Sequence, residues 1–464
     1  MSELGRIGWC VLLVCGLGGC ETVRNARLAQ DPNNAVPGER TPTAAELGLA
    51  TEGELRLDDA LNTALRVHPS ILGALHNEQA AAARTGEVEG ALWPALSGNA
   101  SYQYVDHATQ SGAPAVQHHF QSLGFQLSWL LFDFGRTPAF AREAADQWLA
   151  AQADTRGVEI DVAFAVRSAY FTLLKQMHLR EVAKDSVAQY QEHLDQVHEF
   201  VLVGTRIPYD ETKAEVDLGN AQLLLVQAED AVLSAQATLA NAIGLAETTD
   251  WVPDETVALP DEPPAFEECW KRARLARPAL AAAEARVEAA SELVNARIAS
   301  LYPQLGLGVL ANWAGAAFPL PWSLQFGPSL SWIPFDGFTN LYTIDEAAAS
   351  LKAARATHAF IEQQAWLDVR GAWLAMQDAR RRLDLTTLNV RNAEENVTLA
   401  QGRFDVGKGT TVELTDARQA LVKARADDVQ ARADLDVAAA RLQQAMGVGF
   451  EAAPRAAESP EGTP

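Results

Sequence analysis

The amino-acid sequence predicts an α+β protein built from two copies of one long unit, each with two β-strands and very long helices. Three observations predict it: paired motifs at a fixed offset, short stretches of alternating apolar residues, and long stretches of heptad-spaced apolar residues. The paired residues, each separated by 203 positions (407 − 204), are Phe132 and Phe335, Gly204 and Gly407, and Gly244 and Gly447. Such a duplication indicates one body made of two interlocked halves.

The composition excludes one class of partner. The 464 residues include 37 Lys and Arg against 60 Asp and Glu, which gives a net charge of −23. A nucleic-acid partner requires a basic surface, so none is expected. An acidic surface keeps a large, alanine-rich helical body soluble.

The N-terminus predicts a lipoprotein signal peptide over residues 1–19. Arg6 precedes an apolar stretch that is too short to form a stable bilayer-spanning helix. The stretch ends in Leu-Gly-Gly-Cys20, which resembles the lipobox of bacterial lipoproteins, where the cysteine is lipidated. Cys20 is therefore the expected lipid attachment site, and residues 20–54 are expected to form a lipid-anchored tether. The alternative is an ordinary secretory cleavage site with an incidental cysteine.

The rest of the chain divides into two repeats. Repeat 1 is expected over residues 55–245 and repeat 2 over residues 265–449. A proline-rich linker, 246–264, joins them, and a polar tail, 450–464, is expected to be disordered.

Each repeat begins with two helices and continues with two strands. A proline stops each second helix, because the residue before proline disfavours helical backbone, and alternating apolar and polar residues then indicate strands. The helices are predicted at 57–67, 70–92, 266–276 and 279–301. The strands are predicted at about 95–104, 120–132, 304–313 and 322–333.

The strands have features of a membrane barrel. Five of the eleven tryptophans lie at or near strand ends, as in the aromatic girdles of such barrels. The alternative is a soluble sheet with one face on a core. His118 and His119 are assigned to an outer loop between strands rather than to a metal site.

Two long helices and two return helices complete the repeats. The long helices are predicted at 137–203 and 340–406, each about 100 Å long at ~1.5 Å per residue. Gly204 and Gly407 end them, as glycine does just beyond a helix C-terminus. The return helices, 208–243 and 411–446, have apolar residues at alternating spacings of three and four, which predicts coiled-coil packing.

Over residues 55–449 the chain resembles the TolC family of outer-membrane efflux proteins. The resemblance rests on duplicated motifs: His-Pro or Arg-Pro between the first two helices, Trp-Pro or Tyr-Pro before the strands, Leu-Ser-Trp…Phe-Asp after them, and Arg403-Phe404-x-x-Gly407…Thr410-x-x-Glu413 at a helix tip. It implies a homotrimer whose four strands per chain close as a twelve-stranded outer-membrane β-barrel, continuous with a coiled-coil helical barrel in the periplasm. Strand count alone would also allow eight strands from a dimer.

The resemblance places the functional residues at the two helix tips. The tip turns and the contact with a periplasmic adaptor would involve Gly204, Thr205, Pro208, Arg403, Gly407 and Thr410. Acidic residues six and nine positions after the tip glycine form the periplasmic gate in the family, and here the matching residues are Glu413 and Asp416 in repeat 2. In repeat 1 the first position is acidic, Asp210, whereas Lys213 departs from the pattern. The competing interpretation is that Thr410-x-x-Glu413 is a helix capping box, a role compatible with a gate.

The expected function is a passive duct rather than an enzyme. It would export small molecules, such as drugs, toxic compounds or metal ions, from an inner-membrane pump, of RND type, through the adaptor to the exterior. No cofactor and no bound metal are expected. The alternatives are a type I protein-secretion duct and a non-spanning, lipid-tethered periplasmic coiled-coil scaffold.

Overall fold

A computed structural model describes residues 52–107, 116–247, 250–254 and 264–448, together with positions 26, 43, 44 and 46. The signal peptide, Cys20, most of the tether and the tail lie outside the described residues. The chain divides into two compact units. Unit 1 comprises Met1–Gly73, Val158–Ala276 and Leu367–Pro464, and unit 2 comprises Ala74–Gly157 and Arg277–Trp366.

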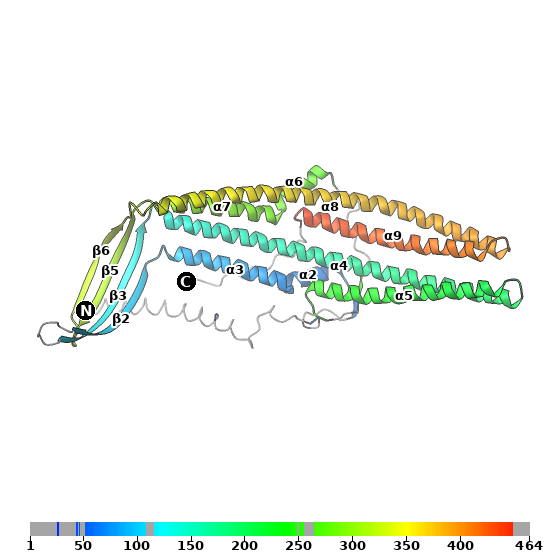
Figure 1. The fold of residues 1–464 in the computed structure, drawn as a ribbon, viewed down its shortest axis with the longest axis horizontal. Coiled ribbons are helices and arrows are strands. Elements are labelled where there is room, and N and C mark those ends of the chain that lie inside the picture. The colour runs from blue at the N-terminus through cyan, green and yellow to red at the C-terminus, as the bar shows by residue number, and fades with distance from the viewer. Residues whose placement is uncertain are drawn as a thin grey trace. The chain divides into compact units, whose positions relative to one another are not determined.

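Unit 2 contains a four-stranded antiparallel sheet in the order β2-β3-β5-β6 (Figure 1). Its strands are β2 (Ala95–His107), β3 (Val116–Phe132), β5 (Gln304–Gly315) and β6 (Trp322–Ser331). The two repeats meet at the centre of the sheet, where β3 pairs with β5 and Leu123 lies opposite Trp313. β2 and β6 are its two edge strands.

Two strand predictions of repeat 1 need correction. β2 continues to His107 and β3 begins at Val116, so His118 and His119 belong to a strand and not to a loop. The apolar alternation ends earlier than the strands, but backbone pairing continues, because the ladder hydrogen bonds require no particular side chain. In repeat 2, β5 runs two residues further than expected, and β6 ends at Ser331 rather than at residue 333.

Large apolar side chains on this sheet remain exposed in the single chain. They include Phe120, Leu123, Phe125, Trp129, Trp322, Leu324, Phe326 and Leu330. Two equivalent tryptophans bond to the turns that follow the helices before the strands: Trp129 Nε1 donates to the Leu92 carbonyl oxygen at 3.0 Å, and Trp332 Nε1 donates to that of Leu301 at 3.1 Å. The duplication thus extends to individual hydrogen bonds.

In each repeat, one helix directly precedes the two strands in the sequence and one long helix follows them. They are α3 (Pro69–Gly90), α7 (Pro278–Ala299), α4 (Arg136–Leu202) and α8 (Thr339–Asp405). α4 and α8 have 67 residues each and begin one residue before the predicted positions. Each follows an aspartate whose Oδ2 accepts a backbone N–H of the first turn: Asp133 from Thr137 at 2.6 Å, and Asp336 from Asn340 at 2.8 Å. Carboxylates here satisfy N–H groups that have no intrahelical partner.

Unit 1 contains a small parallel sheet that the sequence did not predict. Its strands are β1 (Glu52–Leu55) and β4 (Asp250–Pro253). The Tyr170 hydroxyl stabilises them, because its single hydrogen is shared between the carbonyl oxygens of Leu55, at 2.9 Å, and Asp254, at 3.0 Å. The end of the expected tether and part of the expected linker therefore form structure. Strands of four residues are too short to show a periodicity.

The remaining helices also belong to unit 1. They are α2 (Leu57–Val67), α5 (Pro208–Ile243), α6 (Phe266–Ala276) and α9 (Thr411–Ala445). The end of α4 with α5 is called here the first hairpin, and the end of α8 with α9 the second hairpin (Figure 1). Within the first hairpin Leu218 and Ala221 of α5 pack against Tyr190 of α4. None of the described helices has the length and hydropathy needed to cross a membrane.

Candidate functional site

The two predicted tips are helix–turn–helix connections of the same backbone form. Gly204 has φ 74° and Gly407 has φ 72°, the left-handed backbone that glycine adopts without steric cost. In the first tip the Thr205 N–H and hydroxyl both donate to the Phe200 carbonyl oxygen, at 3.0 and 2.9 Å. In the second tip the N–H groups of Lys408 and Gly409 donate to the Arg403 carbonyl oxygen, at 2.9 and 2.8 Å.

The second tip is tightly packed at Gly409. A Cβ added at Gly409 would lie 2.9 Å from the Phe404 nitrogen and 3.1 Å from the Arg403 carbonyl carbon, both backbone atoms. Only glycine fits at that distance. The equivalent position of the first tip holds Arg206, whose guanidinium lies 4.5 Å from the centroid of the Phe404 ring. Arg206 thus connects the first tip to the second hairpin.

The helices that leave the tips start differently. Thr410 precedes α9, and its Oγ1 accepts the Glu413 N–H at 3.1 Å, so one of the two hydrogen bonds of the predicted capping box is present. The Glu413 carboxylate does not complete a capping box; its Oε2 lies 3.6 Å from Arg403 Nη2. α5 instead starts with Pro208 at its first position, after Ile207, which makes no side-chain cap.

The three predicted gate carboxylates fall into two groups. Glu413 and Asp416 are exposed and lie three residues apart on α9, so they share one helix face. Asp210 is half-buried, and its Oδ1 accepts a hydrogen bond from the Thr411 hydroxyl at 3.3 Å. Asp210 therefore links the two hairpins, whereas Glu413 and Asp416 remain accessible in the single chain.

Lys213, which departs from the gate pattern, has a structural role. Its Nζ lies 3.3 Å from Oδ2 of Asp217, a buried carboxylate on the same helix. The same Asp217 oxygen accepts a hydrogen bond from the buried Thr415 hydroxyl of α9 at 3.2 Å. A buried carboxylate needs a cation and hydrogen-bond donors to offset its desolvation. Lys213 serves as that cation.

Arg418 is a second buried charged residue between the hairpins. It donates from Nη1 to the Gln189 carbonyl oxygen of α4 at 3.2 Å and from Nη2 to Gln401 Oε1 of α8 at 2.9 Å. Burial lowers the pKa of its guanidinium. Burial, and then the charge of Asp217, raises the pKa of the neighbouring Tyr190 to about 12. We call the group Tyr190, His193, Lys213, Asp217, Phe404, Thr415 and Arg418 the tip joint.

Sequence reasoning missed the tip joint, although the duplication held a signal for it. Asp217 occurs where the other repeat has Ala420, and Arg418 occurs where the other repeat has Glu215. At some equivalent positions, one repeat has an ionisable residue and the other has a neutral or oppositely charged one. The fold shared by the two repeats does not require a charge at such a position. Such positions are candidates for contacts between the copies.

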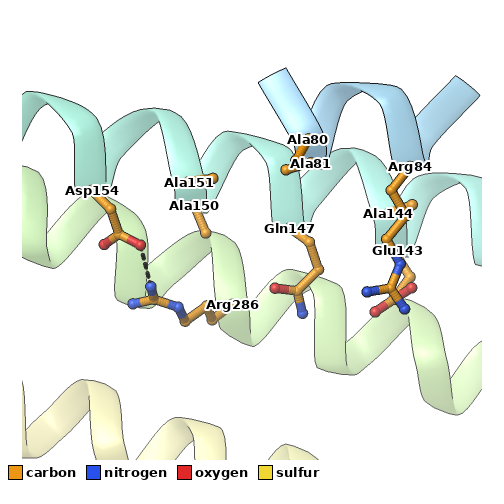
Figure 2. A pocket seen from close by; sticks show the side chains of 10 residues that line it. All are labelled: Ala80, Ala81, Arg84, Glu143, Ala144, Gln147, Ala150, Ala151, Asp154 and Arg286. Atoms are coloured by element: carbon orange, nitrogen blue, oxygen red, sulfur yellow. Dashed lines mark hydrogen bonds and ion pairs between the residues drawn. The ribbon is translucent and has the colours of Figure 1, made fainter. Parts of the chain in front are cut away.

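A separate cavity lies in unit 2, between α3, α4 and α7 (Figure 2). It has a volume of about 610 Å³ and a wall of small alanines, with Arg84, Glu143, Gln147, Asp154 and Arg286 around it. Arg286 forms an ion pair with Asp154. Among the described residues, no group of three or more His, Cys, Asp and Glu could hold a metal ion.

The sequence matches a protein family over both repeats. The model of the outer membrane efflux protein family matches residues 60–245 and 270–448. The outer membrane efflux protein BepC of Brucella suis is 31% identical over 210 residues, which cover 45% of each chain. The solvent efflux pump outer membrane protein SrpC of Pseudomonas putida is 22% identical, with 77% of this chain and 78% of that chain aligned.

Solved structures share the fold. The outer-membrane channel OprN matches with a TM-score of 0.75 at 21% identity, over 85% of this chain and 90% of that chain. The open state of the Neisseria gonorrhoeae MtrE outer membrane channel matches with a TM-score of 0.73 at 21% identity, over 86% and 91% of the chains. These likenesses confirm the α+β fold class predicted from the sequence. Because the family model covers most of both repeats, the chain belongs to the outer membrane efflux protein family.

Proposed function

We propose that this chain is the outer-membrane channel of a tripartite efflux pump and acts as a passive export duct for small molecules. The observation that carries the proposal is the match of the family model to both repeats, which covers the four strands of the antiparallel sheet, the long helices and both tips. Family membership establishes an outer-membrane location and a conduit rather than an enzyme. The pump would supply the energy, and this chain the pore.

The sheet supports the proposal that three chains assemble. Its strands contain 13, 17, 12 and 10 residues, and a tilted strand needs roughly 9–11 residues to cross a bilayer. Edge strands β2 and β6 would leave unpaired backbone groups in lipid, which is costly. A homotrimer would pair these edges and close twelve strands around a pore, with the face of the sheet that carries Leu123, Phe125 and Phe326 toward outer-membrane lipid. Lipidation at Cys20 would anchor each chain further.

The tips are the proposed periplasmic end of the duct. Three copies of Glu413 and Asp416 would bring six carboxylates to one constriction, where they attract cations and repel each other. The exposure of both side chains in the single chain supports this role. Asp210 would act by joining the hairpins. The tip residues Gly204, Thr205, Pro208, Arg403, Gly407 and Thr410 would form the turns that meet a periplasmic adaptor, which connects to an RND-type pump.

Conductance of the trimer in planar bilayers tests the gate. Replacing Glu413 and Asp416 together with Ala should lower cation preference and raise conductance, because the charges that fill the constriction are removed. Glu215→Ala, which removes an exposed carboxylate from α5, serves as the control and should leave both quantities unchanged. Unaltered selectivity and conductance in the double variant would refute the gate.

Extraction of a Cys20→Ala chain tests the channel itself. A membrane-spanning trimer should still require detergent after the lipid anchor is lost, because the apolar side chains of the sheet face lipid. A tethered periplasmic scaffold would become water-soluble, and that result would overturn the proposed channel. Export of small molecules without export of a protein would then separate an efflux duct from a type I secretion duct.

A further inference from the structure

His193 of α4 is the least expected member of the tip joint. Its side chain is fully buried, and neither Nδ1 nor Nε2 has a hydrogen-bond partner. Its ring packs edge-on against the buried ring of Phe404, with centroids 5.6 Å apart and an interplanar angle of 62°. A buried imidazole without partners is compatible with this packing only in its neutral form.

The charges around His193 come from each neighbouring element of the tips. The positive charges of Arg418 on α9 and Arg206 on the first tip turn oppose protonation of His193. The negative charges of Asp217 and Asp210 on α5 favour it. The facing group on α8 is the uncharged ring of Phe404. Asp217 already interacts with Lys213 and Thr415, and Asp210 with Thr411. Burial, followed by Arg418, lowers the pKa of His193 to about 4.

The burial of His193 is a property of one chain. Its 0% exposure is reached without any neighbouring subunit, and its neighbours belong to both hairpins. Water can therefore reach the imidazole only if the hairpins separate locally. The contact between the hairpins and the neutral state of His193 are thus linked.

We propose that His193 makes the contact between the two hairpin tips acid-sensitive, so that protonation of its imidazole drives the tips of one chain apart. This inference goes beyond the channel function, and it does not depend on the Glu413 and Asp416 gate. It assigns to the periplasmic end of the molecule a response to the pH of its surroundings.

The direction of the effect follows from proton linkage. The separated state exposes His193, whose ordinary pKa of 6.5 exceeds its pKa of about 4 in the packed joint. The separated state therefore binds more protons, and the stability of the packed joint is lost as pH falls from 6.5 toward 4. Between pH 7.5 and pH 5.0 these two pKa values correspond to a rise of about 30-fold in the equilibrium constant for separation.

Hydrogen–deuterium exchange of the full-length protein in detergent tests this. Protection is measured at pH 7.5 and 5.0 for peptides covering residues 186–206 and 400–418, after correction for the intrinsic pH dependence of exchange. The wild type should lose protection by about 30-fold at pH 5.0 in these peptides. His193→Phe and His193→Leu, which keep an apolar group that cannot be protonated, should abolish that loss.

A matched histidine on the same helix provides the control. His198 is exposed and forms a hydrogen bond to Glu211 Oε1 at 2.6 Å, which raises its pKa, so its charge is compatible with the packed tip. His198→Gln should retain the acid response of the wild type. An acid response that persists in both His193 variants, or a wild type whose protection does not change, would overturn the proposal. Because the second outcome needs no variant, the test does not depend on how the variants fold.

Discussion

The two helix tips share one backbone turn but differ in the side chains around it. Both turn at a glycine with positive φ, Gly204 or Gly407, and both lead into a return helix. The second tip has the Thr410 cap and the exposed Glu413 and Asp416, whereas equivalent positions of the first tip hold Ile207, Asp210 and Lys213. The second tip thus presents the accessible carboxylates, and the first tip contributes residues that bind it to the second hairpin.

This difference shows how a duplicated unit can divide its tasks. Backbone geometry is common to both copies because the turn requires it, while side chains are free to diverge. Lys213 illustrates the consequence, since the same position that is acidic in repeat 2 supplies the counter-ion of Asp217 in repeat 1. Substitutions at one tip, each with a matched substitution elsewhere, can separate these roles.

Removal of the buried carboxylate should have the largest effect. Asp217→Ala leaves Lys213 and the buried Thr415 hydroxyl without their acceptor, so the tip joint should lose about 3 kcal/mol of stability. Hydrogen exchange of the tip peptides measures this as a lower free energy of local opening. Asp416→Ala, which removes an exposed carboxylate from α9, should change that free energy by no more than about 0.5 kcal/mol. Equal losses in the two variants would contradict the assigned roles.

A side chain at Gly409 should have the second-largest effect on the stability of the tips. Gly409→Ala places a Cβ against the backbone of Phe404 and Arg403, and we expect the second tip to lose about 2 kcal/mol. The same exchange measurement applies, with Lys408→Ala as the neighbouring control, since Lys408 is exposed. A variant as stable as the wild type would mean that the turn can relax without cost.

Loss of the helix cap should have the smallest effect, and it compares the two tips directly. Thr410→Ala removes the acceptor of the Glu413 N–H, so the start of α9 should lose about 1 kcal/mol. Ile207→Ala alters the equivalent position before α5, which has no side-chain cap, and should cost much less at the helix start. If both substitutions destabilise their helices equally, the difference assigned to the two starts is wrong.

The sequence by itself determined the elements whose cause is local. Heptad spacing predicted the return helices, glycine predicted the turns before them, and alternation predicted four strands to within a few residues at most ends. The Thr410 cap was also predictable, because an N-cap involves only the next helical turn. Each of these signals acts over a few residues, so it can be read from the chain without knowledge of its neighbours.

Only the tertiary structure decided which distant segments meet. Residues far apart in the chain are joined by the pairing of β1 with β4 and by the strand order β2-β3-β5-β6. The Tyr170 hydroxyl likewise bridges the carbonyl oxygens of Leu55 and Asp254. The tip joint is of the same kind, since the roles of Asp217, Arg418 and His193 depend on burial between two hairpins. Burial removes water from a charged group and brings new groups next to it, and both effects change the free energy of the charged form. Neither effect can be read from the local spacing of residues.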